Sequence, residues 1–315
     1  MHIAVTGAFG YSGKAIAELL LARGDRVRTL TNSPNRPHAF GSRIDVFPLA
    51  FDDPGALARA LDGCDVLINT YWVRFNHRLF TFEQAVRNTQ RLFAAAKAAG
   101  VGRIVHTSIL KPEEGRGLAY YDGKRRLEQD LAAADVPHTI LRPGVLFGRG
   151  DILVNNTAWI LRHLPVFGVF GDGRYGIAPL HVEDFARIAV AGADGQLPPR
   201  ADASSVVDCH GPETFDYRDL VIRIAAIIGI RRPIVSVWPW IGHLVSKALN
   251  PLVGDVIITR EEIAGLMRGL LWSDRPSLGT TKLTDWAAAH ADTLGRRYAS
   301  EVGRRVKRTL AYEKI

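Results

Sequence analysis

The chain has 315 residues, of which 47% are hydrophobic and 23% charged, and its formal net charge is +8. That length exceeds one compact core of usual size, so we expect one large domain or two unequal ones, and the longest apolar stretches are too short to cross a bilayer. Part of the positive charge lies in residues 295–315 without any nucleic-acid-binding motif, so nucleic acid is not an expected partner, although contact with a membrane surface stays open.

Strands and helices alternate along the first half of the chain. Short β-rich runs predict six strands, at 2–7, 26–32, 43–50, 64–70, 103–108 and 137–143. Helical patterns separate them, at 15–21, after Asp53-Pro54, at 80–99 and at 118–134. This alternation predicts an α/β fold with a parallel sheet that helices cover on both faces.

The regular alternation of strands and helices ends after Pro143. Residues 155–173 indicate a helix and then a Gly-rich loop, and residues 204–229 indicate a late strand and a helix. We therefore expect a doubly wound parallel sheet with a smaller, mostly helical C-terminal lobe. The expected bounds are 1–145, with 177–230 returning, for the sheet domain, and 146–176 with 231–315 for the substrate lobe and tail.

Three glycines, Gly7, Gly10 and Gly13, stand between the first strand and the first helix. Such a turn places backbone N–H groups and the positive end of a helix at one point, which suits a pyrophosphate. The spacing G-x-x-G-x-x-G differs from the commonest dinucleotide fingerprint, and a glycine-rich turn without a ligand is the alternative. The predicted cofactor contacts in this turn are Gly7, Ala8, Phe9, Gly10, Tyr11, Ser12 and Gly13.

The second strand ends in "TLTNSPNR", where NAD-binding proteins usually carry an acidic residue for the ribose hydroxyls. Asn32 and Ser33 are neutral donors there, and Arg36 follows closely, either as a phosphate contact or as a solvated side chain. Since no carboxylate would repel a 2′-phosphate, NADP is the expected cofactor and NAD the second choice.

Several stretches together resemble the extended or atypical short-chain dehydrogenase/reductases. They are "VTGAFGYSG", "FDDPGALARALDGCDVLIN", "RIVHTS", "YYDGKRRLEQDL", "TILRPGVLFGRGD" and "PLHVEDFARIAV". Within the NAD-dependent epimerase/dehydratase group, the branch of NmrA-like proteins and complex I accessory subunits is the most similar. The resemblance implies a Rossmann domain, a bound nicotinamide dinucleotide and a small C-terminal substrate lobe.

A Tyr-x-x-x-Lys pair does the proton chemistry in this group, and Tyr120 and Lys124 have that spacing on a predicted helix. They lie one turn apart and share a face, so the ammonium would lower the phenol pKa toward the working range. Lys124 would also hold the nicotinamide ribose. The alternative for Tyr120 is a hydroxyl in water, and the neighbouring Tyr121 has only Arg125 one turn ahead.

The third catalytic residue implied by the resemblance is a hydroxyl residue after the fifth strand. Ser108 is the first choice and Thr107 the second, and Ile109 interrupts the run of hydroxyl residues that the group often has. The remaining predicted cofactor contacts are Phe51, Asn69, Thr70, Tyr71, Thr107, Lys124, Pro143, Gly144 and Val145. The predicted substrate contacts are Trp72, Asn155 and Asn156, while His181 and Asp184 are expected to be structural.

The favoured function is an NAD(P)-dependent oxidoreductase that acts on a small, largely apolar carbonyl or alcohol. Apolar stretches at 165–171, 235–245 and 248–256 are expected to line the substrate lobe. A nucleotide-sugar-type epimerase or dehydratase with tightly bound NAD stays open, because both reactions use the same first contacts. A non-catalytic NADPH sensor or assembly protein stays open too, since Ile109 interrupts the hydroxyl run.

Two cysteines, Cys64 and Cys209, lie far apart in apolar settings. We expect buried free thiols in a reducing compartment and no metal site. The N-terminal residues show no signal-peptide pattern, so a cytoplasmic location is expected. A homodimer formed through the helices at 80–99 and 118–134 stays open by analogy with the group.

Overall fold

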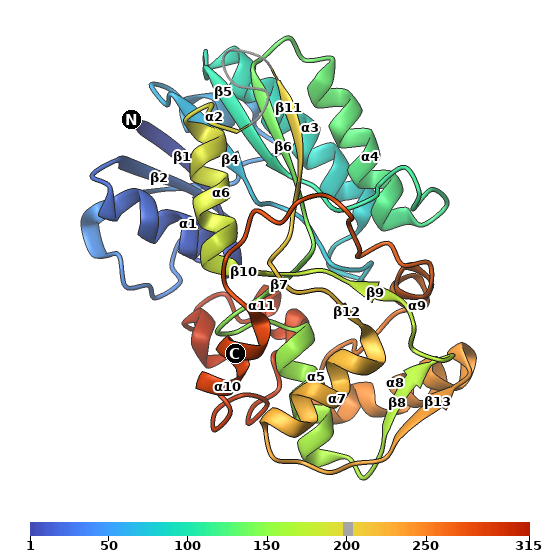
Figure 1. Cartoon of the computed structure of the whole chain (residues 1–315). Coiled ribbons are helices and arrows are strands. Elements are labelled where there is room, and N and C mark those ends of the chain that lie inside the picture. The colour runs from blue at the N-terminus through green and yellow to red at the C-terminus, as the bar shows by residue number, and fades with distance from the viewer. Residues whose placement is uncertain (198–203) are drawn as a thin grey trace. The chain divides into compact units, whose positions relative to one another are not determined.

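The computed structural model describes residues 1–197 and 204–315 (Figure 1). The chain forms two compact units. The first contains Met1–Pro143, Phe185–Cys209 and Arg308–Lys314, and the second contains Gly144–Asp184, His210–Lys307 and Ile315. The sequence analysis instead assigns residues 1–145 and 177–230 to the sheet domain.

The helix α7 (Tyr217–Ile227) is the longest element in the residues that differ. Its buried face, which includes Leu220, Val221 and Ile224, packs in the hydrophobic core of the second unit rather than on the sheet. A helical pattern after a late strand does not tell which core the helix joins.

The first unit contains one seven-stranded sheet in the order β11-β6-β5-β4-β1-β2-β3 (Figure 1). All neighbouring strands run parallel. The strands are β1 (His2–Thr6), β2 (Arg26–Thr31), β3 (Ile44–Pro48), β4 (Val66–Asn69), β5 (Arg103–Thr107), β6 (His138–Pro143) and β11 (Ser205–Cys209). The predicted α/β fold and its six strands are confirmed. The strand order reverses at β1, and open α/β sheets bind their ligands at such a point.

Helices cover this sheet and begin where the sequence supplies caps. Asp53 accepts a hydrogen bond from the Ala56 amide at the start of α2, and Thr81 does the same for Gln84 at the start of α3. Helices α3 and α4 pack against each other. The helices of this layer are α1 (Tyr11–Ala22), α2 (Pro54–Arg59), α3 (Phe82–Ala98), α4 (Ala119–Ala132) and α6 (Val182–Ala193), whose first residues belong to the second unit.

A line of buried polar side chains crosses the middle of the sheet. The Thr6 hydroxyl donates to Asn69 Oδ1 at 2.9 Å, and the Asn69 amide nitrogen lies 3.0 Å from His106 Nδ1. Thr6 is the last residue of β1, Asn69 is the last residue of β4, and His106 lies near the end of β5. All three side chains are buried. Burial and the charge on Lys124 hold the pKa of His106 well below its usual value, so the ring is neutral and accepts this hydrogen bond.

The second unit has three short strand pairs and six helices within its described residues. The pairs are β7 (Val145–Phe147) with β10 (Pro179–His181), β8 (Phe167–Phe170) with β13 (Ile234–Val237), and β9 (Gly176–Ile177) with β12 (Phe215–Asp216). The helices are α5 (Leu153–His163), α7, α8 (Pro239–Val253), α9 (Arg260–Met267), α10 (Leu283–Ala289) and α11 (Glu301–Val306).

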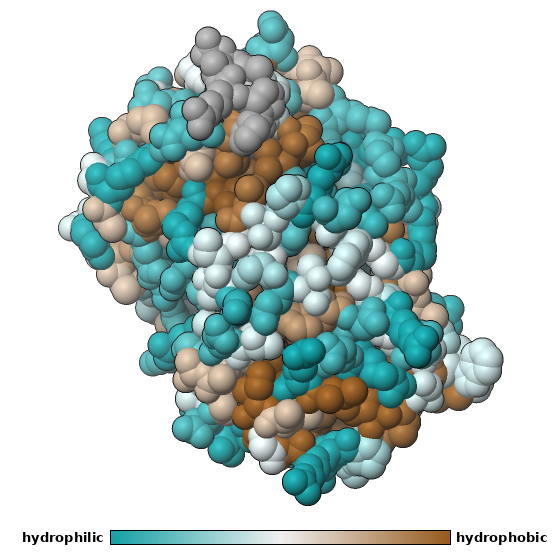
Figure 2. Space-filling view, in the orientation of Figure 1, coloured by the Kyte–Doolittle hydropathy of each residue, from teal (hydrophilic) through white to brown (hydrophobic). Residues whose placement is uncertain are grey.

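The residues expected to form a Gly-rich loop therefore include strand β8. Its pairing with β13 buries Phe167 and Val169 in the core. Figure 2 shows hydrophobic surface over α7, where Ile222 is 48% exposed. Across residues 1–197 and 204–315, no helix has the length and apolar character that crossing a membrane requires.

Candidate dinucleotide and catalytic site

The glycine-rich turn between β1 and α1 is tightly closed. Gly7 has φ +70°, which favours glycine, and its carbonyl accepts a hydrogen bond from the Gly10 amide at 2.8 Å. A Cβ on Gly13 would lie 2.3 Å from the Gly7 carbonyl oxygen. The helix therefore begins directly against the turn, as the glycine spacing predicts.

The start of α1 suits an anion. Its N-cap residue Gly10 supplies no side-chain cap, and the first turn contains no acidic residue. Ala8 and Phe9 are buried, and the Phe9 ring stacks on His38 with 4.0 Å between ring centres. These two residues therefore have only backbone groups to offer a ligand, and the turn as a whole fits a diphosphate.

A segment remote in sequence lies against the end of β2. The Arg308 guanidinium donates to the Asn32 carbonyl at 3.2 Å, and the ring centre of Tyr312 is 5.6 Å from the Arg36 guanidinium carbon. Arg36 is buried, so it is not the solvated side chain of the alternative interpretation. No local sequence signal reveals Arg308 and Tyr312 here, because 276 positions separate Arg308 from Asn32.

The loop after β4 is tied to the end of β1. The Thr70 hydroxyl donates to the Thr6 carbonyl at 2.6 Å, and the Thr70 amide donates to the Thr6 hydroxyl at 2.8 Å. Tyr71 packs on Phe51 with 4.9 Å between ring centres. The Asn69 side chain is occupied by its contacts in the sheet, so a cofactor contact at this residue falls to its backbone.

Lys124 is buried on α4, with 2% of its surface exposed. Its ammonium donates to the Thr107 carbonyl at 2.6 Å and lies 4.3 Å from the centre of the Trp72 ring. Burial lowers the pKa of Lys124 to about 7, and the nearby Glu128 carboxylate opposes the shift. A lysine that loses its proton near neutral pH is typical of a site that moves protons.

Tyr120 lies one turn before Lys124 and shares its aromatic neighbour. The Tyr120 ring meets Trp72 edge-on with 5.7 Å between ring centres, and Phe82 in the same way at 5.6 Å. Tyr121 is buried instead, and its ring fills the space beside Gly115. The structure thus brings the predicted pair together against Trp72, which was predicted as a substrate contact.

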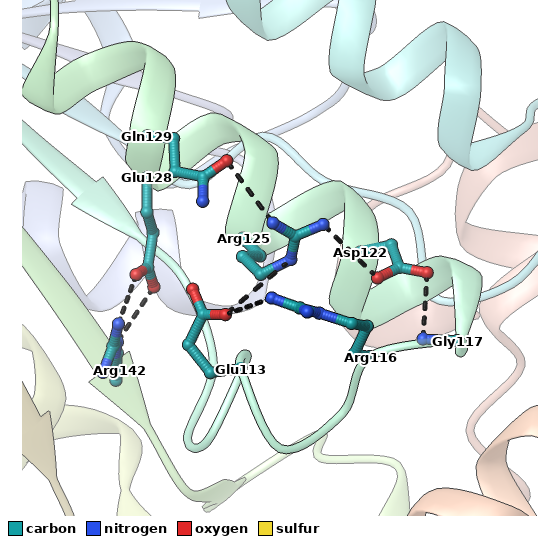
Figure 3. A network of polar contacts seen from close by, with 8 residues as sticks. All are labelled: Glu113, Arg116, Gly117, Asp122, Arg125, Glu128, Gln129 and Arg142. Atoms are coloured by element: carbon teal, nitrogen blue, oxygen red, sulfur yellow. Dashed lines mark hydrogen bonds and ion pairs between the residues drawn. The ribbon is translucent and has the colours of Figure 1, made fainter.

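Figure 3 shows an ion pair between Glu128 and Arg142 that the sequence analysis missed, and the Ser108 hydroxyl joins this pair from directly after β5. It donates to the Glu128 carboxylate, which also accepts from the Arg142 guanidinium at 3.0 and 2.5 Å. The single proton of Ser108 is therefore committed. Among the described residues, the Thr107 hydroxyl oxygen is buried without a hydrogen-bond partner. Thr107 thus has a proton to offer at the same strand end.

Apart from Pro143, the remaining predicted residues belong to the second unit. Asn155 and Asn156 bond to the backbone of residues 295–299, and the Asp184 carboxylate accepts from the Thr280 and Thr281 amides. These contacts give the asparagines and Asp184 a structural role. Val145 begins β7 and its amide donates to the Ala178 carbonyl at 3.1 Å, while Pro143 and Gly144 stand where the first unit ends.

Comparisons with known proteins identify the family of the chain. The family model described as NAD(P)H-binding matches residues 7–154. The (4-alkanoyl-5-oxo-2,5-dihydrofuran-3-yl)methyl phosphate reductase of Streptomyces griseus is 30% identical over 231 residues, which cover 72% of this chain and 74% of the reductase. The chain belongs to the extended short-chain dehydrogenase/reductase group. It is therefore an NAD(P)H-binding oxidoreductase by family.

The chain is also similar to a second reductase in sequence and to an oxidoreductase in fold. The ceramide reductase of Caulobacter vibrioides is 29% identical over 190 residues, which cover 60% of this chain and 60% of that reductase. The NADPH-dependent quinone oxidoreductase of Escherichia coli, solved with NADPH, has a TM-score of 0.74 at 21% identity and covers 92% of this chain and 100% of its own. That likeness concerns the fold. Among the described residues, no group of three His, Cys, Asp or Glu side chains is arranged to hold a metal.

Proposed function

We propose that this protein is an NADPH-dependent reductase of a ketone that carries an alkyl chain. The observation that carries the proposal is the buried Lys124, which lies one turn from Tyr120 and contacts Trp72 and the end of β5. The printed names of two relatives, an alkanoyl-substituted phosphate reductase and a ceramide reductase, favour an alkyl-bearing substrate.

When bound, NADPH supplies a hydride to the carbonyl carbon. The Tyr120 hydroxyl donates the proton that the carbonyl oxygen needs, so a ketone, one hydride and one proton become an alcohol. The Lys124 ammonium donates one hydrogen bond to the Thr107 carbonyl, which leaves two of its protons for a ribose hydroxyl. The Thr107 hydroxyl donates to the carbonyl oxygen and polarises it. Ser108 does not take this role, because its proton is already donated to Glu128.

Two features support an alkyl-bearing substrate and NADPH. Trp72, Phe82 and Tyr120 pack into one apolar cluster, which suits hydrocarbon beside the reacting carbonyl. Arg36 and Arg308 both lie at the end of β2, and Glu313 of the same C-terminal segment pairs with Lys14. Two guanidinium groups there favour NADPH over NADH.

The experiment compares Tyr120→Phe with Tyr121→Phe as a matched control. Both variants are assayed for NADPH binding by calorimetry and for NADPH oxidation with 3-oxoacyl thioesters, alkyl ketones and quinones. We expect Tyr120→Phe to bind NADPH normally and to lose roughly 10³-fold in turnover, because the proton donor is gone. Tyr121→Phe should keep turnover within a few-fold. Equal activity of the two variants would contradict the proposal.

A second candidate is a dinucleotide-binding protein without turnover. It is favoured by the Ser108 hydroxyl, whose proton goes to Glu128 rather than toward a substrate. Under this alternative, NADPH binds to the wild-type chain but no ketone or quinone in the panel consumes it. A co-purifying NAD that is not exchanged, together with conversion of a nucleotide sugar, would instead favour the epimerase alternative.

A further inference from the structure

Helix α8 is apolar yet exposed. Trp238, directly before the helix, is 71% exposed, and within it Trp240 is 66%, Leu244 61% and Leu252 72% exposed. Ser246 is its only buried residue. Large apolar side chains gathered on a surface in this way mark a place where something binds.

The two faces of α8 are reversed relative to an ordinary surface helix. Gly242, Ser246 and Asn250 face the protein: a Cβ on Gly242 would lie 2.3 Å from the Phe170 ring, and Asn250 Oδ1 accepts from the Ile257 amide. The opposite stripe, at spacing i, i+4, contains Trp240, Leu244, Ala248 and Leu252. The helix thus turns small and polar residues inward and apolar residues outward, so packing on α9 and β8 does not explain its composition.

From residue 231 to residue 260 the exposed charged side chains are all positive, and the acidic Glu261 and Glu262 follow in the first turn of α9. Arg231, Arg232, Lys247 and Arg260 are exposed, whereas the single acidic residue from 231 to 260, Asp255, is buried and accepts from the Glu301 and Val302 amides. Burial and the charges on Arg260 and Lys247 lower the pKa of His243. An apolar stripe with Lys247 and Arg260 nearby complements a surface that offers hydrocarbon and negative charge together.

We propose that Trp238 and α8 dock the protein on the surface of an anionic phospholipid bilayer, with the helix lying in the plane of the interface. At about 1.5 Å per residue, the 15 residues of α8 extend roughly 22 Å, too short to cross a bilayer but sufficient to lie along it. Tryptophan rings favour the headgroup region, and basic side chains are attracted to anionic lipid. The docking does not depend on the proposed reaction.

Vesicle flotation of the full chain tests the proposal. Vesicles of phosphatidylcholine alone are compared with vesicles that contain about one part in four of phosphatidylglycerol, at low and high salt (about 0.05 and 0.5 M). We expect binding to the anionic vesicles, weak binding to the neutral ones, and loss of most binding at high salt. A blue shift of tryptophan fluorescence should accompany binding.

The variant Trp240→Ser/Leu244→Ser should bind the anionic vesicles at least about tenfold more weakly, because it loses two interfacial side chains. Ile222→Ser, which removes an exposed apolar side chain from α7 in the same unit, should bind like the wild type. Circular dichroism and NADPH affinity should match in all three proteins, which shows that each is folded.

Three results would overturn the proposal. The wild-type chain could remain unbound with both vesicles, or the double variant could float as well as the wild type. Light scattering could also show a dimer that the double variant abolishes while no vesicle binding is found, in which case α8 covers a second copy of this chain instead.

Discussion

Two helices of nearly equal length depart from the usual burial rule in opposite directions. Helix α4, of 14 residues, buries Lys124 and Glu128, whereas α8, of 15 residues, exposes Trp240 and Leu244. Charged side chains are normally exposed, and large apolar side chains are normally buried. Each departure costs free energy unless a contact compensates it.

The two departures differ in how they are compensated. The Glu128 carboxylate is satisfied by Ser108 and Arg142, and the Lys124 ammonium by the Thr107 carbonyl and the Trp72 ring. The exposed stripe of α8 has no comparable compensation within its unit. Buried charges must be partnered by the fold itself, while exposed apolar groups tolerate water until a partner arrives.

The largest effect is expected from replacing Lys124, which should lower the activity without lowering the stability of the fold. Lys124→Met removes the buried charge at similar volume, so we expect ketone reduction to fall about 10²–10⁴-fold while the free energy of unfolding stays equal or rises. NADPH oxidation and urea unfolding measure the two quantities. Lys97→Met on α3, where the lysine is exposed, is the control and should change neither. A strongly destabilised Lys124→Met would show that the lysine is there for the fold.

Removing Glu128, the other buried charge of α4, should lower the stability of the fold. Glu128→Ala leaves the Arg142 guanidinium half-buried without its carboxylate, which should lower the free energy of unfolding by about 3 kcal/mol. Glu113→Ala, at the exposed end of the same network, should cost at most about 1 kcal/mol. Similar losses in urea titrations of the two variants would contradict the distinction between buried and exposed charges.

The pH dependence of stability should show the lowered pKa of Lys124. The native amine loses its proton near pH 7, whereas the unfolded amine keeps it to about pH 10, so the unfolded state binds one more proton between these values. Stability contributed by this group should therefore rise with pH across that window, by up to about 1.4 kcal/mol per unit. The difference in unfolding free energy between wild type and Lys124→Met, measured from pH 7 to 9, isolates this slope. A constant difference would mean that the pKa is not lowered.

A smaller effect concerns cofactor choice at the end of β2. Arg308→Gln should weaken NADPH binding about tenfold and leave NADH binding nearly unchanged, because only NADPH carries the 2′-phosphate that the guanidinium would meet. Calorimetry with both cofactors measures the ratio. Arg305→Gln, whose guanidinium pairs with Glu301, serves as the control. Equal losses for the two cofactors would remove Arg308 from cofactor selection.

The smallest effect is expected on α8. In the absence of lipid, Trp240→Ser/Leu244→Ser should change the free energy of unfolding by no more than about 0.5 kcal/mol, because both side chains are in water. Urea unfolding measures this directly. A loss of several kcal/mol would show that these side chains support the fold, and the contrast with α4 would disappear.

The fold was largely predictable because its signals are local. Alternating β-rich runs and helical patterns define six strands of the sheet, and Gly7 and Gly13 show where the first helix meets its turn. The assignment of α7 and the pairing of β8 with β13 were not predictable, because both depend on which distant core the segment joins.

The site was predictable in part for the same reason. Tyr120 and Lys124 are one helical turn apart, so sequence spacing alone brings them together. The commitment of Ser108 to Glu128 and Arg142, and the approach of Arg308 to Asn32, arise from contacts between remote segments. Residues 235–245 were expected to line a substrate lobe, yet Trp238 and Trp240 are exposed, because hydropathy does not tell inward from outward on a helix of this kind.

The hydrogen-bonded line from Thr6 through Asn69 to His106 has a consequence for how the strands align. A slip of β4 by one residue would carry the Asn69 amide to the opposite face of the sheet and leave Thr6 and His106 unsatisfied in a dry interior. The apolar residues of β4 are buried on both faces and would tolerate that slip. The hydrogen bonds of a single amide therefore oppose a slip in the register of the central strands.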